Sequence, residues 1–362
     1  MFDVTNVLRG VSVFALGGLL ALPEAARADA ASDILNYTGA DRQKMLEDGA
    51  RKEGELMFYS ALTIDQGLRA IVDGFKNRYP FIKTDFWRGT ELQIVQKTLA
   101  EQRANALVGD VVESVGIVTH LSKANAVLPF TSPYFKDIPE RYRDKSNLSA
   151  ASRLNFFGLA YNTKLVPPGT QPKTYDELLD PKWKGKLAWR EDAISGTALF
   201  ISSMMLTRGE KATEDYLIKL RAQNIVSFTG SGRTLVNRVI EGEYHLAVNI
   251  FMHHPIISAS AGAPSAPQPM EPIPSISGSM LIPKGVKHPH AAMLFVDFVL
   301  SPEGQSVMRD AQYFPVTSTV KPLKELEPIM PEHTGLKEIF VSDSQLFEYQ
   351  RKVDTIYKKY FR

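Results

Sequence analysis

Residues 55–79 read ELMFYSALTIDQGLRAIVDGFKNRY. The first six, ELMFYS, form a short apolar run that stops at a polar turn, as a buried parallel strand does. From residue 67 onward the apolar side chains recur at helical spacing; they are Leu68, Ile71, Val72 and Phe75. The stretch therefore predicts a strand followed by a helix.

The same alternation continues toward the C-terminus. Predicted strands cover residues 82–87, 109–113, 186–189, 225–229 and 245–249, and predicted helices cover 91–105, 117–124, 196–208, 212–222 and 234–242. Repeated strand–helix order predicts a parallel α/β sheet with ligand-competent loops at the carboxyl ends of its strands. Residues 153–163 are an apolar extended run that we interpret as a crossing into a second lobe. An Ala-, Pro-, Ser- and Gly-rich connection over 258–274 precedes a returning strand at 277–283.

The length, charge and cysteine content of the chain exclude several classes of protein and of binding site. The chain has 362 residues, 44% hydrophobic and 23% charged, which is enough for two domains with separate cores. Its 42 Lys and Arg against 40 Asp and Glu give a net charge of +2, without the long basic run that would track a nucleic acid. Cysteine is absent, which removes disulfides, thiolate metal sites and a lipid-modified cysteine anchor.

The N-terminus reads as a secretory signal over residues 1–28. Arg9 precedes an apolar run at 11–22, and the small-residue pattern Ala26-Arg27-Ala28 follows it. We predict cleavage after Ala28, with Ala30 as the alternative. The apolar run is shorter than the ~20 residues of a membrane-spanning helix, although an uncleaved anchor remains the alternative. The mature protein is therefore expected in the periplasm.

Seven short motifs, taken in order and spacing, carry a resemblance to type 2 periplasmic solute-binding proteins of ABC transporters. They are Phe58-Tyr59-Ser60, Gly109-Asp110-Val111-Val112, Leu159-Ala160-Tyr161-Asn162-Thr163, Pro181-Lys182-Trp183-Lys184-Gly185-Lys186, Ser195-Gly196-Thr197, Glu241-Gly242-Glu243 and Ser301-Pro302-Glu303-Gly304-Gln305. The chain resembles the cluster that includes receptors for ferric iron, thiamine, polyamines and phosphonates. The resemblance implies an α/β two-lobed fold with a ligand cleft, lobe one being 29–155 plus 275–362 and lobe two 156–274.

The same resemblance implies a receptor and not an enzyme. Such proteins close over one small ligand by hinge motion and deliver it to a membrane permease. We expect a monomer that needs no cofactor and binds no nucleic acid. A secreted enzyme is the alternative from another class, but no Gly-x-Ser-x-Gly or His-Glu-x-x-His motif supports it. A sensor that reports the ligand to a membrane receptor is a further alternative.

Anion-binding residues are expected at two helix starts. Hydroxyls and free backbone N–H groups converge at Ser195-Gly196-Thr197 and at Gly230-Ser231-Gly232-Arg233, where the helix dipole favours negative charge. An N-cap that serves only its own helix is the competing interpretation. Arg88 follows a strand of lobe one, so we expect it to face the same anion from the opposite wall. The predicted ligand-binding set also includes Thr63, Ser114, Asn249 and His253.

Iron is the alternative ligand. Ferric receptors of the resembled cluster have adjacent tyrosines after the strand that ends here at Ile250, where this chain has Phe251-Met252. They also have a His and a Glu at loop positions where this chain has Thr63 and Val115. Because these ligands are missing, we expect no metal site. The leading hypothesis is an organic anion such as a carboxylate, phosphonate or sugar phosphate. Either His253 or His254 could be a hydrogen-bond partner of the ligand or a metal ligand, but metal binding is the weaker interpretation because no acidic or Cys partner lies nearby at metal-ligand spacing.

Overall fold

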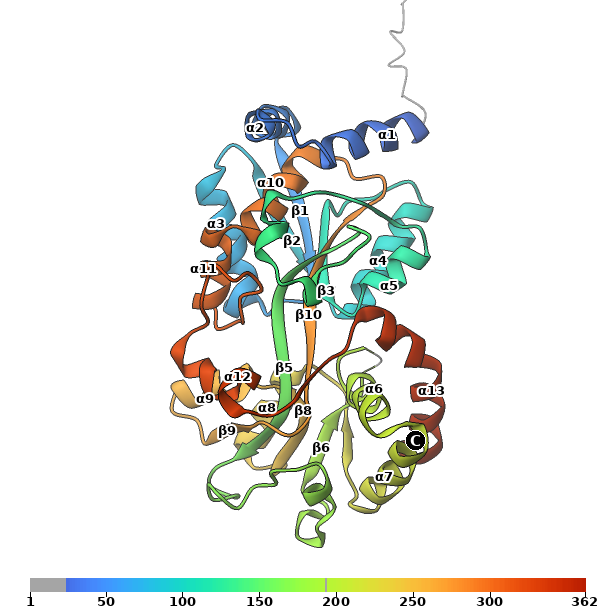
Figure 1. Ribbon diagram of the computed structural model, residues 1–362, viewed down its shortest axis with the longest axis vertical. Helices are drawn as coiled ribbons and strands as arrows, with labels where there is room; N and C mark the ends of the chain where they lie inside the picture. The colour runs from blue at the N-terminus through green and yellow to red at the C-terminus, as the bar shows by residue number, and fades with distance from the viewer. Residues whose placement is uncertain (1–23, 193) are drawn as a thin grey trace, which may run out of the picture.

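The computed structural model describes residues 24–192 and 194–362, which form two lobes stacked along the long axis of the molecule (Figure 1). Of the predicted signal, residues 1–23 lie outside the described part. The first helix, α1 (Glu24–Leu35), spans both predicted cleavage points. None of the described helices combines the length and apolarity needed to span a bilayer.

Lobe one is built on three parallel strands in the order β2, β1, β3, as the strand–helix alternation predicts. Its strands are β1 (Glu55–Ser60), β2 (Lys83–Arg88), β3 (Val111–Val115) and β4 (Val127–Leu128); its helices are α2 (Arg42–Glu53), α3 (Arg69–Arg78), α4 (Glu91–Arg103), α5 (Val118–Lys123), α10 (Pro289–Leu300) and α11 (Pro302–Asp310). α4 begins at a capping box in which the Thr90 hydroxyl and the Gln93 side chain each accept from the other residue's backbone N–H. That cap fixes where the chain turns after β2, and so places the start of α4 beside the cleft.

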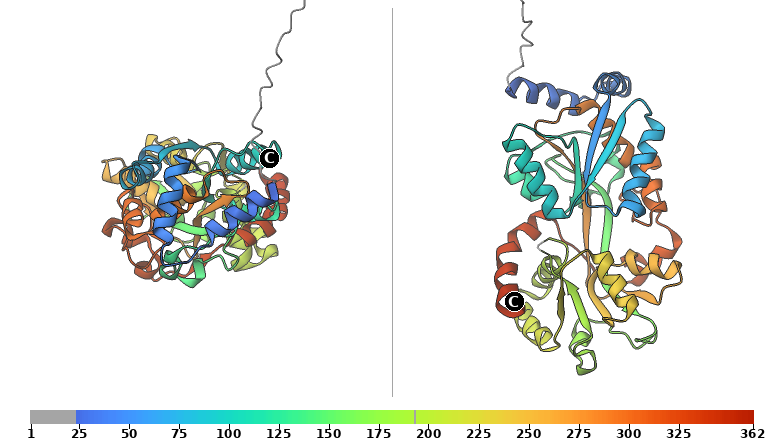
Figure 2. Two further views of the ribbon diagram at one scale, coloured as in Figure 1. Left: turned by 90° about the horizontal axis from the view of Figure 1, so that it is seen from above. Right: turned by 180° about the vertical axis from the view of Figure 1, so that it is seen from behind.

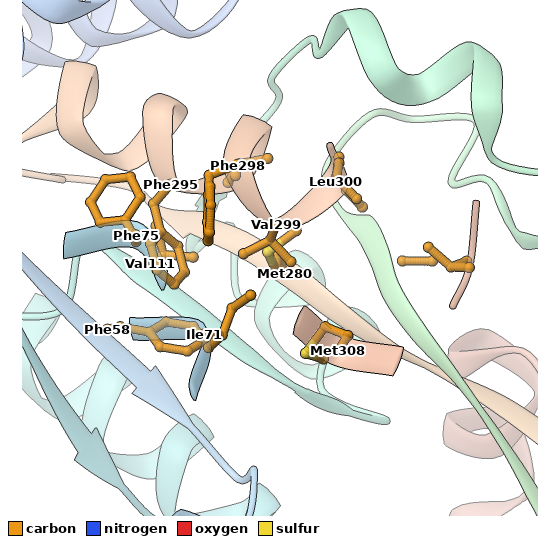
Figure 3. Close-up of a cluster of buried hydrophobic side chains, with 14 of the residues drawn as sticks. Phe58, Ile71, Phe75, Val111, Met280, Phe295, Phe298, Val299, Leu300 and Met308 are labelled. Carbon is orange, nitrogen blue, oxygen red and sulfur yellow. The ribbon is translucent and has the colours of Figure 1, made fainter. Parts of the chain in front are cut away.

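An aromatic core holds lobe one together. The ring of Phe295, on α10, lies 4.6 Å from that of Phe58 on β1 and 5.0 Å from that of Phe75 on α3, measured between centroids. Figure 3 shows these rings between the helices and the sheet. All three side chains are buried. The core makes β1 and β3 a rigid support for the loops at their carboxyl ends.

Lobe two repeats the architecture with its own core around Trp189 and Phe200. Its strands are β6 (Leu187–Arg190), β7 (Val226–Phe228), β8 (Leu246–Phe251) and β9 (Ser265–Gln268); its helices are α6 (Thr197–Arg208), α7 (Glu210–Ala222), α8 (Gly232–Glu241) and α9 (His253–Ser260). β6 lies parallel to both β7 and β8. The loops after β6 and β8 therefore point toward lobe one.

Two long strands cross between the lobes. β5 (Ala150–Asn162) and β10 (Ile273–Pro283) pair antiparallel with each other and join the lobes into one continuous sheet. The front and rear views both show them running from one lobe into the other (Figures 1 and 2). They correspond to the crossing predicted at 153–163 and the return predicted at 277–283.

Two regions differ from the sequence-based expectation. Residues 258–274, expected as a surface connection, contain the end of α9 and the strand β9, which pairs with β5. The last helix, α13 (Asp343–Phe361), packs against α6 and α7 of lobe two and also contacts α5 of lobe one, whereas the sequence places residues 275–362 in lobe one. Its apolar face supplies Val353 and Tyr357 to the core around Trp189. The chain thus crosses between the lobes a third time, after β11 (Glu338–Phe340).

Candidate ligand-binding site

A pocket lies between the lobes, where the carboxyl ends of β1, β2 and β3 face those of β6, β7 and β8. The cavity itself has a volume of about 70 Å³, and about 590 Å³ of space free of protein atoms lies between the walls when the adjoining open solvent is included. Six of the ten predicted site residues line it: Thr63, Arg88, Ser114, Ser231, Arg233 and His253. These six come from both lobes, so a molecule in the pocket contacts both walls.

The other four predicted residues lie behind the pocket wall. Ser195 and Gly196 belong to the turn before α6, and Thr197 is the first residue of that helix. The side-chain amide of Asn249 donates to the Gly196 carbonyl at 3.0 Å. None of these four residues lines the pocket. Their contacts in this structure are with the protein itself.

A carboxylate of the chain organises the loop that leads into α6. Asp192 Oδ1 accepts from the backbone N–H of Ser195 at 2.6 Å and of Ile194 at 2.9 Å, and the Thr197 hydroxyl donates to the Asp192 carbonyl at 3.2 Å. Both of these N–H groups lie in the loop ahead of α6, and the first-turn N–H of Ala198 donates to the backbone carbonyl of Asp192 at 3.2 Å. Asp192 thus ties this loop to the first turn of α6, which has no side-chain cap.

The start of α8 is organised differently and opens to the pocket. The Ser231 hydroxyl accepts from the backbone N–H of Thr234 at 3.0 Å, which leaves the N–H groups of the first residues for another partner. Arg233 extends from the same turn and donates to the His254 carbonyl at 2.9 Å. Arg88 faces it from the end of β2. Among the described residues, neither arginine has an acidic partner within ion-pair distance.

Two further arginines line the pocket and were not predicted. Arg153, on β5, forms a buried ion pair with Glu113 of β3. Arg190, at the end of β6, pairs with Glu91 of α4 at 3.2 Å and with Asp192 at 2.9 Å. Arg190 is the last residue of β6, as Arg88 is of β2, so the same sequence signal would have identified it. The other polar residues at the wall that the prediction omits are Thr90, Glu91, Asn155, His254 and Tyr313.

Several buried polar atoms at the pocket have no partner in the described protein. They are the Ser114 hydroxyl, Asn155 Oδ1, both ring nitrogens of His253 and Nδ1 of His254. Buried polar groups are normally hydrogen-bonded, and leaving one unsatisfied costs about 1–3 kcal/mol. Together these atoms form a set of neutral hydrogen-bonding groups that a bound molecule would satisfy.

Both pocket histidines are held in the neutral form. Burial lowers the pKa of His254 to about 3, and the charge of Arg233 adds to the effect. Burial also lowers the pKa of His253 well below its usual range, with further contributions from His254 and Arg153. A neutral imidazole has one donor and one acceptor nitrogen, so each ring can serve a hydroxyl or a carbonyl of a ligand.

The neutral state of these rings predicts a specific NMR result. In the ligand-free protein, the ring C–H resonances of His253 and His254 should not titrate between pH 8 and pH 5. His288 should titrate above the usual histidine range, because its hydrogen bond to Asp110 at 3.0 Å raises its pKa. Histidine-labelled ¹H–¹³C spectra would measure all three. A pocket histidine that titrates near pH 6.5 would contradict the neutral assignment.

Metal ligands are sparse at this site. The described residues contain no group of three or more His, Cys, Asp and Glu side chains placed to hold a metal ion. Phe251 lines the pocket where the resembled ferric receptors have a tyrosine, and Tyr313 is the single tyrosine in the lining. A phenolate site built from adjacent tyrosines is therefore missing from the described pocket.

Comparisons with known proteins agree with the geometry of a two-lobed receptor. A family model described as bacterial extracellular solute-binding protein matches residues 108–335. The Fe(3+)-binding periplasmic protein of Serratia marcescens is 22% identical over 258 residues, 68% of this chain and 74% of that protein. Iron-bound HitA from Pseudomonas aeruginosa has a TM-score of 0.72 at 18% identity, covering 85% of this chain and 99% of HitA. AfuA from Actinobacillus pleuropneumoniae, solved with fructose-6-phosphate bound, has a TM-score of 0.72 at 25% identity, covering 85% and 98%.

Proposed function

Because the chain belongs to the bacterial extracellular solute-binding protein family, as a periplasmic receptor of an ABC importer, we propose that its ligand is a small organic anion. Members of this family bind substrates for transport and are not enzymes. We propose that this one acts as a monomer, closes over its ligand and delivers it to a permease, with no catalytic step. A carboxylate, a phosphonate or a sugar phosphate fits this proposal.

One observation carries the proposal. Arg88 and Arg233 face the same pocket from opposite lobes, and no described carboxylate neutralises either of them. Burial lowers the pKa of Arg233, which means that its charge is poorly solvated and would gain from an anionic partner. The N–H groups at the start of α8 add further donors for the same anion. An anion held by both arginines would also draw the two lobes together.

The neutral polar atoms of the pocket favour a ligand with hydroxyl groups as well as a charge. His253, Ser114 and Asn155 present unsatisfied nitrogen and oxygen atoms next to the arginines. A simple inorganic anion would leave these atoms unsatisfied. Among the three ligand classes, a sugar phosphate supplies both a charged end for the arginines and hydroxyls for this neutral end. The fructose-6-phosphate bound in AfuA is consistent with this choice.

Ferric iron is the second candidate, since a relative is an Fe(3+)-binding protein and HitA was solved with iron. Tyr313 could supply one phenolate oxygen, but its pKa is raised by burial, which opposes the charged form. Iron would then need a bound chelator, such as citrate, that provides most of the oxygen ligands. A chelate of this kind would itself be an anion for Arg88 and Arg233.

A thermal-shift screen tests the proposal directly. The mature protein, residues 29–362, would be heated with sugar phosphates, phosphonates, small carboxylates, ferric citrate and free ferric iron. A true ligand present at about 100-fold above its Kd should raise the melting temperature by about 5 °C. A shift with an iron-free organic anion supports the proposal. A shift with iron alone, together with a visible absorption band, would overturn it in favour of the metal.

A further inference from the structure

An ion pair joins the two lobes beside the pocket. Glu91, the first residue of α4 in lobe one, pairs with Arg190 of β6 in lobe two at 3.2 Å. The Ser195 hydroxyl, also in lobe two, donates to Glu91 Oε1 at 2.8 Å and accepts from Arg190 Nη1 at 2.7 Å. Both charged side chains are only 8% exposed. One carboxylate of lobe one is therefore held by two groups of the other lobe.

Arg190 also has partners within its own lobe. Asp192 Oδ2 accepts from its Nη2 at 2.9 Å, and the Gly230 carbonyl accepts from its Nε at 2.9 Å. If the lobes separate, these contacts keep the guanidinium paired. Breaking a buried ion pair is usually costly because one charge is left buried and alone. That cost is absent on the side of lobe two.

The carboxylate of Glu91 is also stabilised when it is separated from Arg190. It occupies the first turn of α4, where the helix dipole favours a negative charge, and separation of the lobes would return its carboxylate to water. In the paired state burial opposes its charge, but the interactions with Arg190 and Ser195 prevail and lower the pKa of Glu91. The contact can therefore form and break without stranding a charge on either lobe.

We infer that Glu91 and Arg190 form a latch between the lobes that holds the receptor closed and so positions the pocket walls around the ligand. Both latch residues line the pocket, so the contact lies next to the space that the ligand fills. The latch raises the fraction of closed molecules before a ligand arrives. This inference concerns closure alone and holds whichever ligand the pocket binds.

The absence of cysteine in the sequence makes a distance measurement simple. Cysteines introduced at the exposed positions Arg103 in lobe one and Lys219 in lobe two can each carry a spin label or a dye. The inter-lobe distance distribution would be measured without ligand in the labelled parent protein and in Glu91→Gln. We expect the closed-to-open ratio to fall about fivefold to tenfold in Glu91→Gln. An unchanged distribution would overturn the latch.

Three controls separate the latch from general damage. Glu348→Gln removes an exposed carboxylate of α13 and should leave the distribution of the parent unchanged. Ser195→Ala keeps both charges and should open the lobes to a smaller extent than Glu91→Gln. Raising NaCl from about 50 mM to about 500 mM should shift the parent toward the open distance more than Glu91→Gln, because salt weakens ion pairs. An equal salt response in both proteins would overturn the inference even if Glu91→Gln is less stable. Since no ligand is added, these results do not depend on whether the ligand is an anion.

Discussion

Replacing Arg233 with alanine is expected to weaken binding of the organic anion by about 10- to 150-fold, or about 1.5–3 kcal/mol. The guanidinium has no acidic partner among the described residues and lies at the start of α8, where a bound anion would meet it together with backbone N–H groups. Arg88→Ala should have an effect of the same kind, because Arg88 faces the pocket from lobe one. Isothermal titration calorimetry with the organic anion that most stabilises the protein in the thermal screen would measure both.

The control is Arg351→Ala, which removes an exposed arginine of α13 and should leave the Kd unchanged. Because neither Arg88 nor Arg233 forms an ion pair with a described residue, each variant should also retain normal thermal stability without ligand. Unchanged affinity in both Arg88→Ala and Arg233→Ala would refute the anion site. A loss that appears only with ferric citrate would assign the arginines to a chelate instead.

Sequence reasoning predicted the sheet because strand and helix periods are local. The run 55–60 is apolar on both faces, and Leu68, Ile71, Val72 and Phe75 recur at helical spacing, which is enough to predict β1 and α3. The third crossing was not predictable in this way. α13 has an amphipathic pattern that would fit either lobe, and only the packing of Val353 and Tyr357 against Trp189 decides between them.

The pocket residues also divide into those that a local sequence signal predicts and those that depend on long-range contacts. Arg88 and Arg233 were predicted because each follows a strand or begins a helix, positions that the sequence shows directly. The difference between the starts of α6 and α8 was not visible, because it depends on whether a nearby carboxylate folds back. Asp192 does so at α6, three residues before Ser195, and no equivalent acid precedes Ser231. Long-range partners such as Glu113 and Arg153, which are 40 residues apart, require the fold itself.

Glu113→Gln is expected to lower the free energy of unfolding by about 3–5 kcal/mol, because it leaves the charge of Arg153 buried without a partner. Glu113 is 1% exposed and Arg153 is 5% exposed. The carboxylate also accepts from the Ser60 hydroxyl at 2.7 Å and from the Ser152 hydroxyl at 3.0 Å, so three elements of lobe one depend on it. Burial lowers the pKa of Arg153 to about 10, which still leaves the guanidinium charged at neutral pH. Urea unfolding at pH 7, followed by circular dichroism, would measure the loss.

Two comparisons identify the buried charge as the cause. Asp176→Asn removes a carboxylate, 68% exposed, that pairs with Arg208, and an exposed pair of this kind contributes at most about 1 kcal/mol. The double variant Glu113→Gln, Arg153→Met removes both buried charges and should recover part of the stability lost in Glu113→Gln, because an apolar side chain carries no desolvation penalty. If the double variant were less stable than Glu113→Gln alone, Arg153 would be stabilising the fold by contacts other than the ion pair. Its guanidinium lies 5.2 Å from the centre of the Tyr313 ring, so the cation–π contact with that pocket tyrosine would be the first of these to test.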